Sequence, residues 1–232
     1  SSAVDLDNPE IQMAKKIGIP VIRRAEMLAE LLKVKNTSIA VAGTHGKTTT
    51  SSILGSILTE AQLDPTLVIG GIVNKFKTNA ISGNGDLIVV EADEFDRSFL
   101  LLQPTLSIIT NLDLEHLDCY KNMDDLKTAF SQFANSSPFY GLISICIDCP
   151  NLYDLTKKIN KPIITYGLSQ KANYRAINVK FENNSSNFDL MVNETIVANI
   201  TNKIPGNHNI CNALGAISIA AEMDIPFKTI KK

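Results

Sequence analysis

The chain has 232 residues, of which 44% are hydrophobic, and a formal net charge of −2. This length is enough to bury a domain-sized core. The near balance of acidic and basic residues excludes the basic surface that a general nucleic-acid-binding protein needs. The chain contains no apolar run of about 18 residues or more and opens with no signal peptide, so we expect a soluble, cytoplasmic protein without a membrane partner.

The first part of the chain predicts two helices around a short strand. Pro9 marks a helix start, and Gly18-Ile-Pro20 breaks that helix. Val21-Ile22 favours a short strand, and residues 25–33 place apolar side chains on one face of a second helix. This piece is too small to be a domain. Because the chain lacks an initiating Met and stops within a helical pattern, we expect a fragment of a longer protein.

From residue 37 onward, strands and helices alternate. Strands are predicted over 38–42, 66–69, 87–92, 105–110, 142–147 and 163–166, and helices from 46, over 123–135 and over 152–159. Apolar, β-branched runs separated by amphipathic helices predict an α/β fold of the P-loop type, a mostly parallel sheet with helices on both faces. Alternating apolar residues over 177–181, 188–192 and 196–200 then predict a small antiparallel meander, followed by a helix over 207–223.

The first of these strands ends in Gly43-Thr-His-Gly-Lys-Thr48, which has the features of a phosphate-binding loop. Its glycines let backbone N–H groups approach an anion, and the helix that starts near Gly46 points its positive end at that anion. Lys47 is placed to reach the outer phosphates, and the Thr48 hydroxyl to ligate a nucleotide-bound Mg²⁺. The loop departs from the standard spacing, which would have glycine in place of Val41. The alternative is a helix start that contains Gly-Lys-Thr by chance.

Polar side chains also follow two other strands, at the edge where a parallel sheet binds its ligands. Glu91 opens the carboxylate-rich stretch Glu91–Asp96 and is the best candidate for a Mg²⁺ ligand; the alternative is an exposed acidic strand end. His116 lies within the acidic stretch Asp113–Asp118, which favours a site residue over a structural histidine.

The last helix opens with Pro205-Gly-Asn-His-Asn-Ile-Cys-Asn-Ala213. Asn207 is a candidate cap for this helix. Asn209 and Asn212 lie three residues apart, so they can share a face and offer amide groups to a purine ring.

The chain has four cysteines, and we expect them to be reduced thiols. Cys146 and Cys149 have the spacing of a metal or redox motif. Since no second pair and no nearby histidine accompany them, we interpret the motif as structural.

Four motifs, in this order and spacing, resemble those of the Mur ligases. They are Gly43–Thr48, Glu91–Glu94, Thr110-Asn111 with His116–Tyr120, and Pro205–Ala213. The resemblance covers essentially the whole chain and explains Val41, because the loop of this family resembles Gly-Thr-x-Gly-Lys-Thr. Within the family, Asp96–Pro104 and His116–Tyr120 look most like the members that add L-alanine.

The resemblance implies a three-domain enzyme of peptidoglycan synthesis. Residues 1–36 would be the end of an N-terminal UDP-binding domain, and residues 37–232 the central ATP-binding domain. The implied reaction uses ATP and Mg²⁺ to join L-alanine to UDP-N-acetylmuramate through an acyl phosphate, by positioning and charge neutralisation. These small molecules are the implied partners, and the oligomeric state stays open.

The resemblance also implies roles for individual residues. Catalytic roles fall to Lys47, Glu91 and His116, and metal-site roles to Thr48, Glu91 and His116. The implied ATP-binding residues are Gly43, Thr44, His45, Gly46, Lys47, Thr48, Thr49, Asn111, Asn209 and Asn212. Asn79 and Asp93 are implied to lie on the muramate side.

Three other functions compete with this one. A murein-peptide recycling ligase shares the phosphate loop but adds a tripeptide, and the missing C-terminal domain would select between the two amines. A nucleotide-binding module without chemistry of its own is the second alternative. A nucleotide kinase is the third, weakened by the lack of a recognisable lid.

Overall fold

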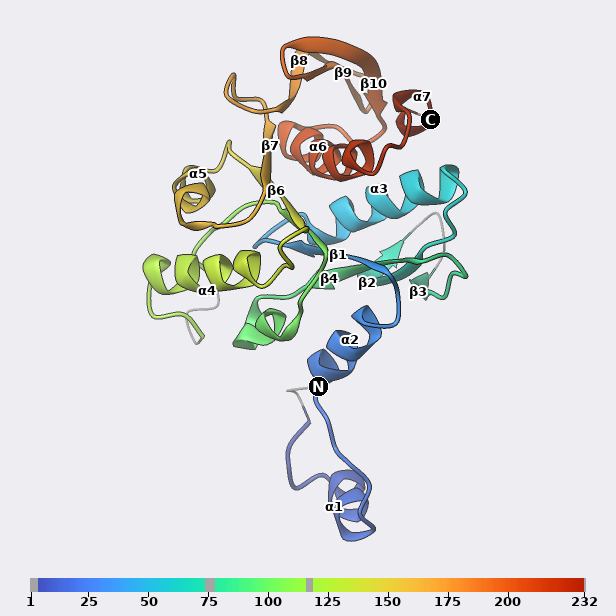
Figure 1. The fold of residues 1–232 in the computed structure, drawn as a ribbon, viewed down its shortest axis with the longest axis vertical. Helices are drawn as coiled ribbons and strands as arrows, with labels where there is room; N and C mark the ends of the chain where they lie inside the picture. The colour runs from blue at the N-terminus through green and yellow to red at the C-terminus, as the bar shows by residue number, and fades with distance from the viewer. Residues whose placement is uncertain (1–3, 74–77, 116–118, 232) are drawn as a thin grey trace.

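The computed structural model describes residues 4–73, 78–115 and 119–231. The strands in these residues are β1 (Thr37–Ala42), β2 (Thr66–Val73), β3 (Thr78–Ile81), β4 (Leu87–Ala92), β5 (Leu106–Ile109), β6 (Leu142–Cys146), β7 (Ile163–Gly167), β8 (Tyr174–Glu182), β9 (Ser185–Val192) and β10 (Thr195–Asn202). Within the described residues they form one ten-stranded sheet in the order β10-β9-β8-β7-β6-β5-β1-β4-β2-β3 (Figure 1). In this spatial order, each pair of neighbours between β8 and β2 is parallel. At one edge β3 is antiparallel to β2, and at the other β9 is antiparallel to both β8 and β10. The predicted mostly parallel α/β fold is confirmed.

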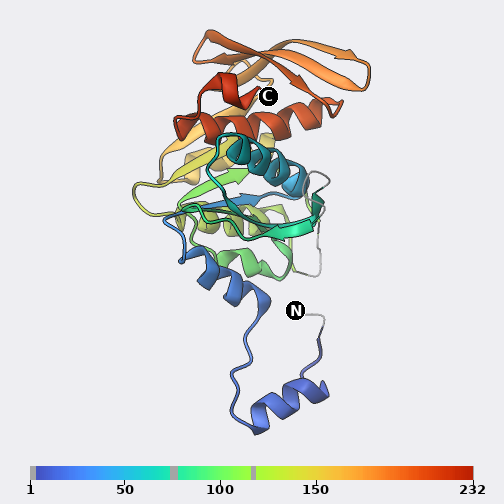
Figure 2. The same ribbon diagram turned by 90° about the vertical axis from the view of Figure 1, so that its right-hand side faces the viewer.

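Helices cover both faces of this sheet. The described helices are α1 (Pro9–Lys16), α2 (Arg24–Leu32), α3 (Lys47–Glu60), α4 (Met123–Asn135), α5 (Pro150–Leu155), α6 (Asn207–Glu222) and α7 (Phe227–Ile230), with 3-10 turns η1 (Phe95–Leu101) and η2 (Thr156–Lys158). α3 and α6 pack together on one side, and α4 and η1 lie on the opposite side (Figures 1 and 2). The central strands β1, β4 and β5 are therefore buried on both faces, as their continuous apolar runs predict.

The predicted antiparallel meander is confirmed as β8, β9 and β10. β8 pairs in parallel with β7, so the meander extends the main sheet. It curls over α6, which contacts both β8 and β10 (Figure 1). Enclosed in this way, every residue from 212 to 220 is buried, which explains why the helix is apolar on all sides.

The beginning of the chain differs from its prediction. Val21 and Ile22 are exposed and form no strand. A strand has to pair its backbone groups with a neighbour, and local β propensity cannot supply that neighbour. α1 has no buried residue and stands away from the body on an extended segment (Figure 2). Among the described residues, no helix combines the length and apolar character that a membrane span needs.

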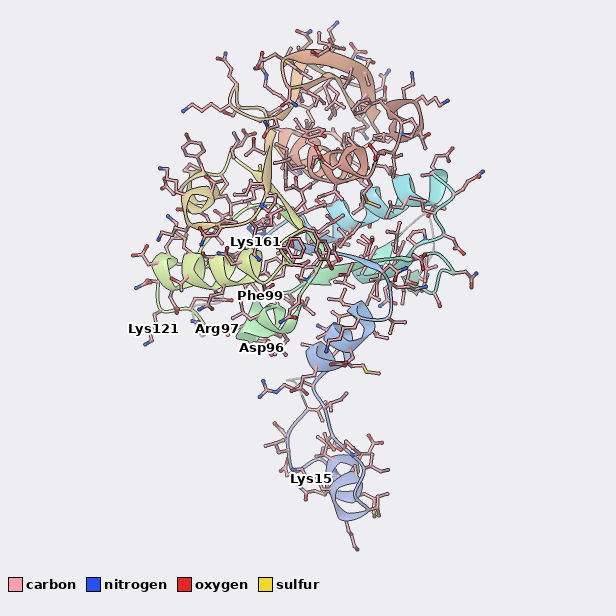
Figure 3. All side chains as sticks on the ribbon, viewed as in Figure 1. Lys15, Asp96, Arg97, Phe99, Lys121 and Lys161 are labelled. Carbon is pink, nitrogen blue, oxygen red and sulfur yellow. The ribbon has the colours of Figure 1, made fainter. Side chains whose placement is uncertain are left out.

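Two elements were not predicted, the edge strand β3 and the turn η1. η1 contains left-handed backbone at Asp96 (φ 52°) and Arg97 (φ 59°), which no periodic pattern signals. Phe99 anchors this turn by pointing toward α4 (Figure 3), where its ring centroid lies 5.0 Å from that of Phe130 and 5.1 Å from that of Phe133. η1 is thereby fixed at the end of β4, next to the predicted site.

The strand order also places the predicted phosphate loop. β1 lies between β4 and β5. The connection from β1 to β2 runs toward one edge of the sheet, and the connection from β4 to β5 runs toward the other edge. A crevice forms beyond the carboxyl ends of the strands at such a point, and ligands of open α/β sheets bind there. The loop Gly43–Gly46 follows β1 directly and opens into α3.

Candidate functional site

Both glycines of the loop occupy positions where a side chain cannot fit. Gly43 has φ +131° and Gly46 φ +82°, values that favour glycine. A Cβ at Gly43 would lie 2.1 Å from Thr110 Oγ1, and one at Gly46 would lie 2.3 Å from Asn212 Oδ1. The loop is thus pressed against the segment after β5 on one side and against α6 on the other.

Side chains that follow β5 hold the loop in this conformation. Asn111 Oδ1 accepts from His45 N at 2.8 Å, and Asn111 Nδ2 donates to His45 O at 2.9 Å. Thr110 Oγ1 donates to the same carbonyl at 2.6 Å. Thr44 Oγ1 donates to Asp113 O at 3.1 Å and accepts from Asp113 N at 3.0 Å. The structure therefore brings Thr44, His45 and Asn111 together and gives Asn111 a positioning role in the loop.

Lys47, the first residue of α3, folds back over this loop. Its Nζ donates to Gly43 O at 2.7 Å, to Thr44 O at 3.3 Å and to Glu94 Oε2 at 2.8 Å. The side chain of Lys47 is only 16% exposed and that of Glu94 only 2%, so this ion pair is shielded from water. A lysine ammonium has three donors, and here all three are directed at the loop and at Glu94.

Sequence reasoning missed Glu94 as the partner of Lys47. The only signal for it was its place among the carboxylates after β4, and nothing local distinguishes it from them. Its backbone carbonyl accepts from Tyr120 Oη at 2.6 Å. Burial raises the pKa of Tyr120, so this hydroxyl stays protonated and keeps donating.

The candidate metal residues Thr48 and Glu91 each lie against a glycine of β2. Gly70 N donates to Glu91 Oε1 at 2.9 Å. A Cβ at Gly70 would lie 2.8 Å from Glu91 Oε2, and one at Gly71 would lie 3.1 Å from Thr48 Cγ2. Carboxylate and hydroxyl oxygens are hard donors, so the side chains of Glu91 and Thr48 are of the type that fits Mg²⁺.

The two asparagines of α6 lie on one face of the helix, as predicted. Both are buried, and Asn212 Nδ2 donates to Asn209 Oδ1 at 3.3 Å. Asn209 Nδ2 donates to Pro205 O at 2.8 Å. The prediction that Asn207 caps the helix is wrong, because the N-cap is Gly206 and Asn207 already lies inside the helix. Asn212, which touches Gly46, connects this face to the phosphate loop.

The remaining predicted residues are placed as follows. Thr49 is half-buried in the first turn of α3. Asp93 is half-buried, and its Oδ1 accepts from Phe95 N at 3.2 Å in a local turn. Asn79 is exposed on the edge strand β3, which is separated from β4 by β2. His116 lies outside the described residues.

Comparison with known proteins identifies the family. The Mur ligase middle domain matches residues 41–220, and the Mur ligase family catalytic domain matches residues 1–36. The chain belongs to the Mur ligase family. The resemblance recognised in the sequence motifs is thus confirmed.

Two curated relatives share the name UDP-N-acetylmuramate--L-alanine ligase. The chain is 49% identical to the UDP-N-acetylmuramate--L-alanine ligase of Geobacter sp. (strain M21), over 100% of this chain and 50% of the relative. It is 50% identical to the ligase of the same name from Persephonella marina (strain DSM 14350 / EX-H1), again over 100% of this chain and 50% of the relative. The chain therefore spans about half the length of these relatives.

Solved Mur ligase structures share the fold. The UDP-N-acetylmuramate-alanine ligase from Thermotoga maritima superposes with a TM-score of 0.85 at 27% identity, covering 99% of this chain and 51% of that one. The UDP-N-acetylmuramate:L-alanyl-gamma-D-glutamyl-meso-diaminopimelate ligase from Neisseria meningitides also has a TM-score of 0.85, at 25% identity, covering 99% of this chain and 74% of that one. The backbone alone does not distinguish these two ligases.

Proposed function

We propose that this chain supplies the nucleotide-binding core of a cytoplasmic enzyme that joins L-alanine to UDP-N-acetylmuramate, with ATP converted to ADP and phosphate. The observation that carries this proposal is the identity of 49% and 50%, along the whole chain, to ligases with that name. We further propose that residues 37–232 form the ATP-binding unit and that residues 1–36 belong to the preceding UDP-binding domain. The shape of the chain supports this division, because α1 stands apart from the body.

ATP phosphates fit the loop between β1 and α3. The loop N–H groups and the positive end of α3 would face the phosphates, and the ammonium of Lys47 would balance their negative charge. In the structure Lys47 Nζ donates two hydrogen bonds to loop carbonyls and one to Glu94. A phosphate oxygen can take the place of the loop carbonyls as acceptor, while the hydrogen bond to Glu94 persists. Glu94 then serves to orient Lys47. Asn209 and Asn212, next to Gly46, are placed for the adenine.

Thr48 and Glu91 would hold Mg²⁺, and we propose that His116 joins them. Bound there, the ion would neutralise charge on the outer phosphates. The chain's own part is to position the muramate carboxylate for attack on the γ-phosphate. We assign Asn79 and Asp93 to that side. The acyl phosphate then reacts with the amine of L-alanine, which releases phosphate.

The recycling reaction is the second candidate, because the ligase from Neisseria meningitides is as similar in backbone as the alanine ligase. In that case the amine would come from a tripeptide. The identities of 49% and 50% to alanine ligases favour the first candidate.

A coupled assay for ADP release by the full-length enzyme tests both proposals. We expect release that requires UDP-N-acetylmuramate and L-alanine together, and that the tripeptide does not support. Glu91→Gln should cut turnover severely while leaving the melting temperature within a few degrees, whereas Glu182→Gln, an exposed control on β8, should change neither. Turnover with the tripeptide but not with alanine would assign the recycling reaction instead. Unchanged turnover in Glu91→Gln would remove this residue from the site.

A further inference from the structure

A cluster of sulfur and oxygen ligands lies away from the proposed magnesium site. It consists of Cys146 at the end of β6, Asp148 in the loop that follows, and Cys211 near the start of α6. The two Sγ atoms and a carboxylate oxygen all lie within 4.8 Å of one another. Contacts between α6 and β6 bring these distant parts of the sequence together.

The distance between Cys211 and Asp148 suits two ligands of a tetrahedral metal ion. Cys211 Sγ lies 3.5 Å from Asp148 Oδ2. With bonds of about 2.3 Å to sulfur and about 2.1 Å to oxygen, two ligands of a tetrahedral zinc ion are about 3.6 Å apart. The sulfur and the carboxylate therefore already have the separation of two ligands on one ion.

The carboxylate of Asp148 is held in place by the backbone after β7. Leu168 N donates to Oδ2 at 2.7 Å, and Ser169 N donates to Oδ1 at 2.9 Å. Gly167 makes this approach possible, since a Cβ there would lie 2.4 Å from Asp148 Oδ1. Each oxygen keeps lone-pair capacity for a further partner. Such outer-shell bonds orient ligands in known metal sites.

We propose that Cys146, Cys211 and Asp148 form a binding site for one thiolate-preferring divalent cation of the zinc class. Both cysteines bind as thiolates and release their thiol protons to solvent, and a water completes the fourth position. Its two soft sulfur ligands distinguish this site from the proposed magnesium site, to which Thr48 and Glu91 would supply hard oxygen ligands. The ion fastens the start of α6, which carries Asn209 and Asn212, to the end of β6.

The cysteine that lies with Cys146 in this cluster is Cys211. It is not Cys149, which has the spacing of a metal or redox motif with Cys146 in the sequence. Cys149 is the N-cap residue of α5, and its Sγ lies 3.8 Å from Leu112 O. It is half-buried, as Cys211 is, and so provides a matched control.

Anaerobic titration of the reduced chain with Co²⁺, followed by Zn²⁺, tests the site. We expect one equivalent of Co²⁺ to give thiolate-to-cobalt charge-transfer absorption and tetrahedral d–d bands, and Zn²⁺ to abolish both. Since losing even an outer-shell partner weakens metal binding by roughly 10- to 100-fold, Cys211→Ser should weaken it at least about tenfold, and Cys149→Ser should leave it unchanged.

A second measurement needs no variant. Zn²⁺ should slow alkylation of Cys211 in the unmodified chain, followed by mass spectrometry, while the half-buried Cys119 and Cys149 react at their original rates. Absence of a charge-transfer band in the unmodified chain would overturn the proposal, as would equal affinity in Cys211→Ser. A reduced chain that takes no metal but forms a Cys146–Cys211 disulfide on oxidation would reassign the cluster as a redox pair.

Discussion

Replacing Gly46 by alanine tests the packing that joins the phosphate loop to α6. Two separate costs follow from the structure. Gly46 has φ +82°, and left-handed backbone costs an L-residue about 1–2 kcal/mol. The new Cβ would also lie 2.3 Å from Asn212 Oδ1, far inside normal contact. Asn212 is buried and hydrogen-bonded to Asn209, so relieving this clash adds the cost of an overpacked core, about 1–3 kcal/mol. Gly46→Ala should therefore lower the free energy of unfolding by roughly 2–5 kcal/mol.

A double-mutant cycle separates the two costs. In an Asn212→Ala background the clash is absent, and Gly46→Ala should cost only the backbone part, about 1–2 kcal/mol. Urea denaturation followed by far-ultraviolet circular dichroism gives the four free energies, which suits a chain without tryptophan. Equal costs of Gly46→Ala in both backgrounds would refute the contact between the loop and α6.

Three further predictions follow from other parts of the structure. Phe99→Ala removes a buried ring that stacks on Phe133 and is tilted against Phe130, so it should lower the free energy of unfolding by about 3–5 kcal/mol in urea denaturation. Phe139→Ala, at an 85% exposed ring, should lower it by under about 1 kcal/mol. The hydrogen bond from Arg97 lowers the pKa of Asp125 below 3.8, so this pair stabilises the fold above that pH and loses its effect as the pH falls through the lowered value. The urea midpoint of Asp125→Asn should therefore lie below that of the unmodified chain at pH 7 and converge with it in acid, and a gap that grew toward acid would contradict this sign. The 232-residue chain by itself should form no UDP-muramoyl-alanine, because an amine without a held position forgoes roughly 7–11 kcal/mol of barrier lowering, and product that disappears in Lys47→Ala would disprove this.

The sequence predicted those parts of the fold whose signal is local. The strand over residues 87–92 and the helix over residues 123–135 match the structure to the residue, because a β-branched run and a helical period are complete within each segment. The glycine loop could be found for the same reason, since the strand, the glycines and the helix follow one another directly.

Features that depend on distant partners could not be predicted in this way. Val21-Ile22 has strand propensity but no neighbouring strand, whereas β3, which has little propensity, exists because β2 pairs with it. The pairing of Lys47 with Glu94 depends on the turn after β4, in which Glu94 is followed by the left-handed residues Asp96 and Arg97. The sequence identified only a group of carboxylates there and did not single out Glu94. The approach of Cys211 to Cys146 likewise requires α6 to lie on β6.

Binding of Mg²⁺-ATP to the unmodified chain and to Lys47→Ala, compared with binding of adenosine to both, tests the central claim most directly. Calorimetry should show that Lys47→Ala weakens Mg²⁺-ATP binding by roughly 10- to 100-fold, because a charge-assisted bond to phosphate is worth about 1.5–3 kcal/mol. Adenosine, measured by ligand-observed NMR, should bind both proteins equally, since it has no phosphate for Lys47 to contact. Equal binding also shows that Lys47→Ala leaves the asparagine face of α6 intact. Undiminished Mg²⁺-ATP binding in Lys47→Ala would contradict the placement of the phosphates on the Gly43–Thr48 loop.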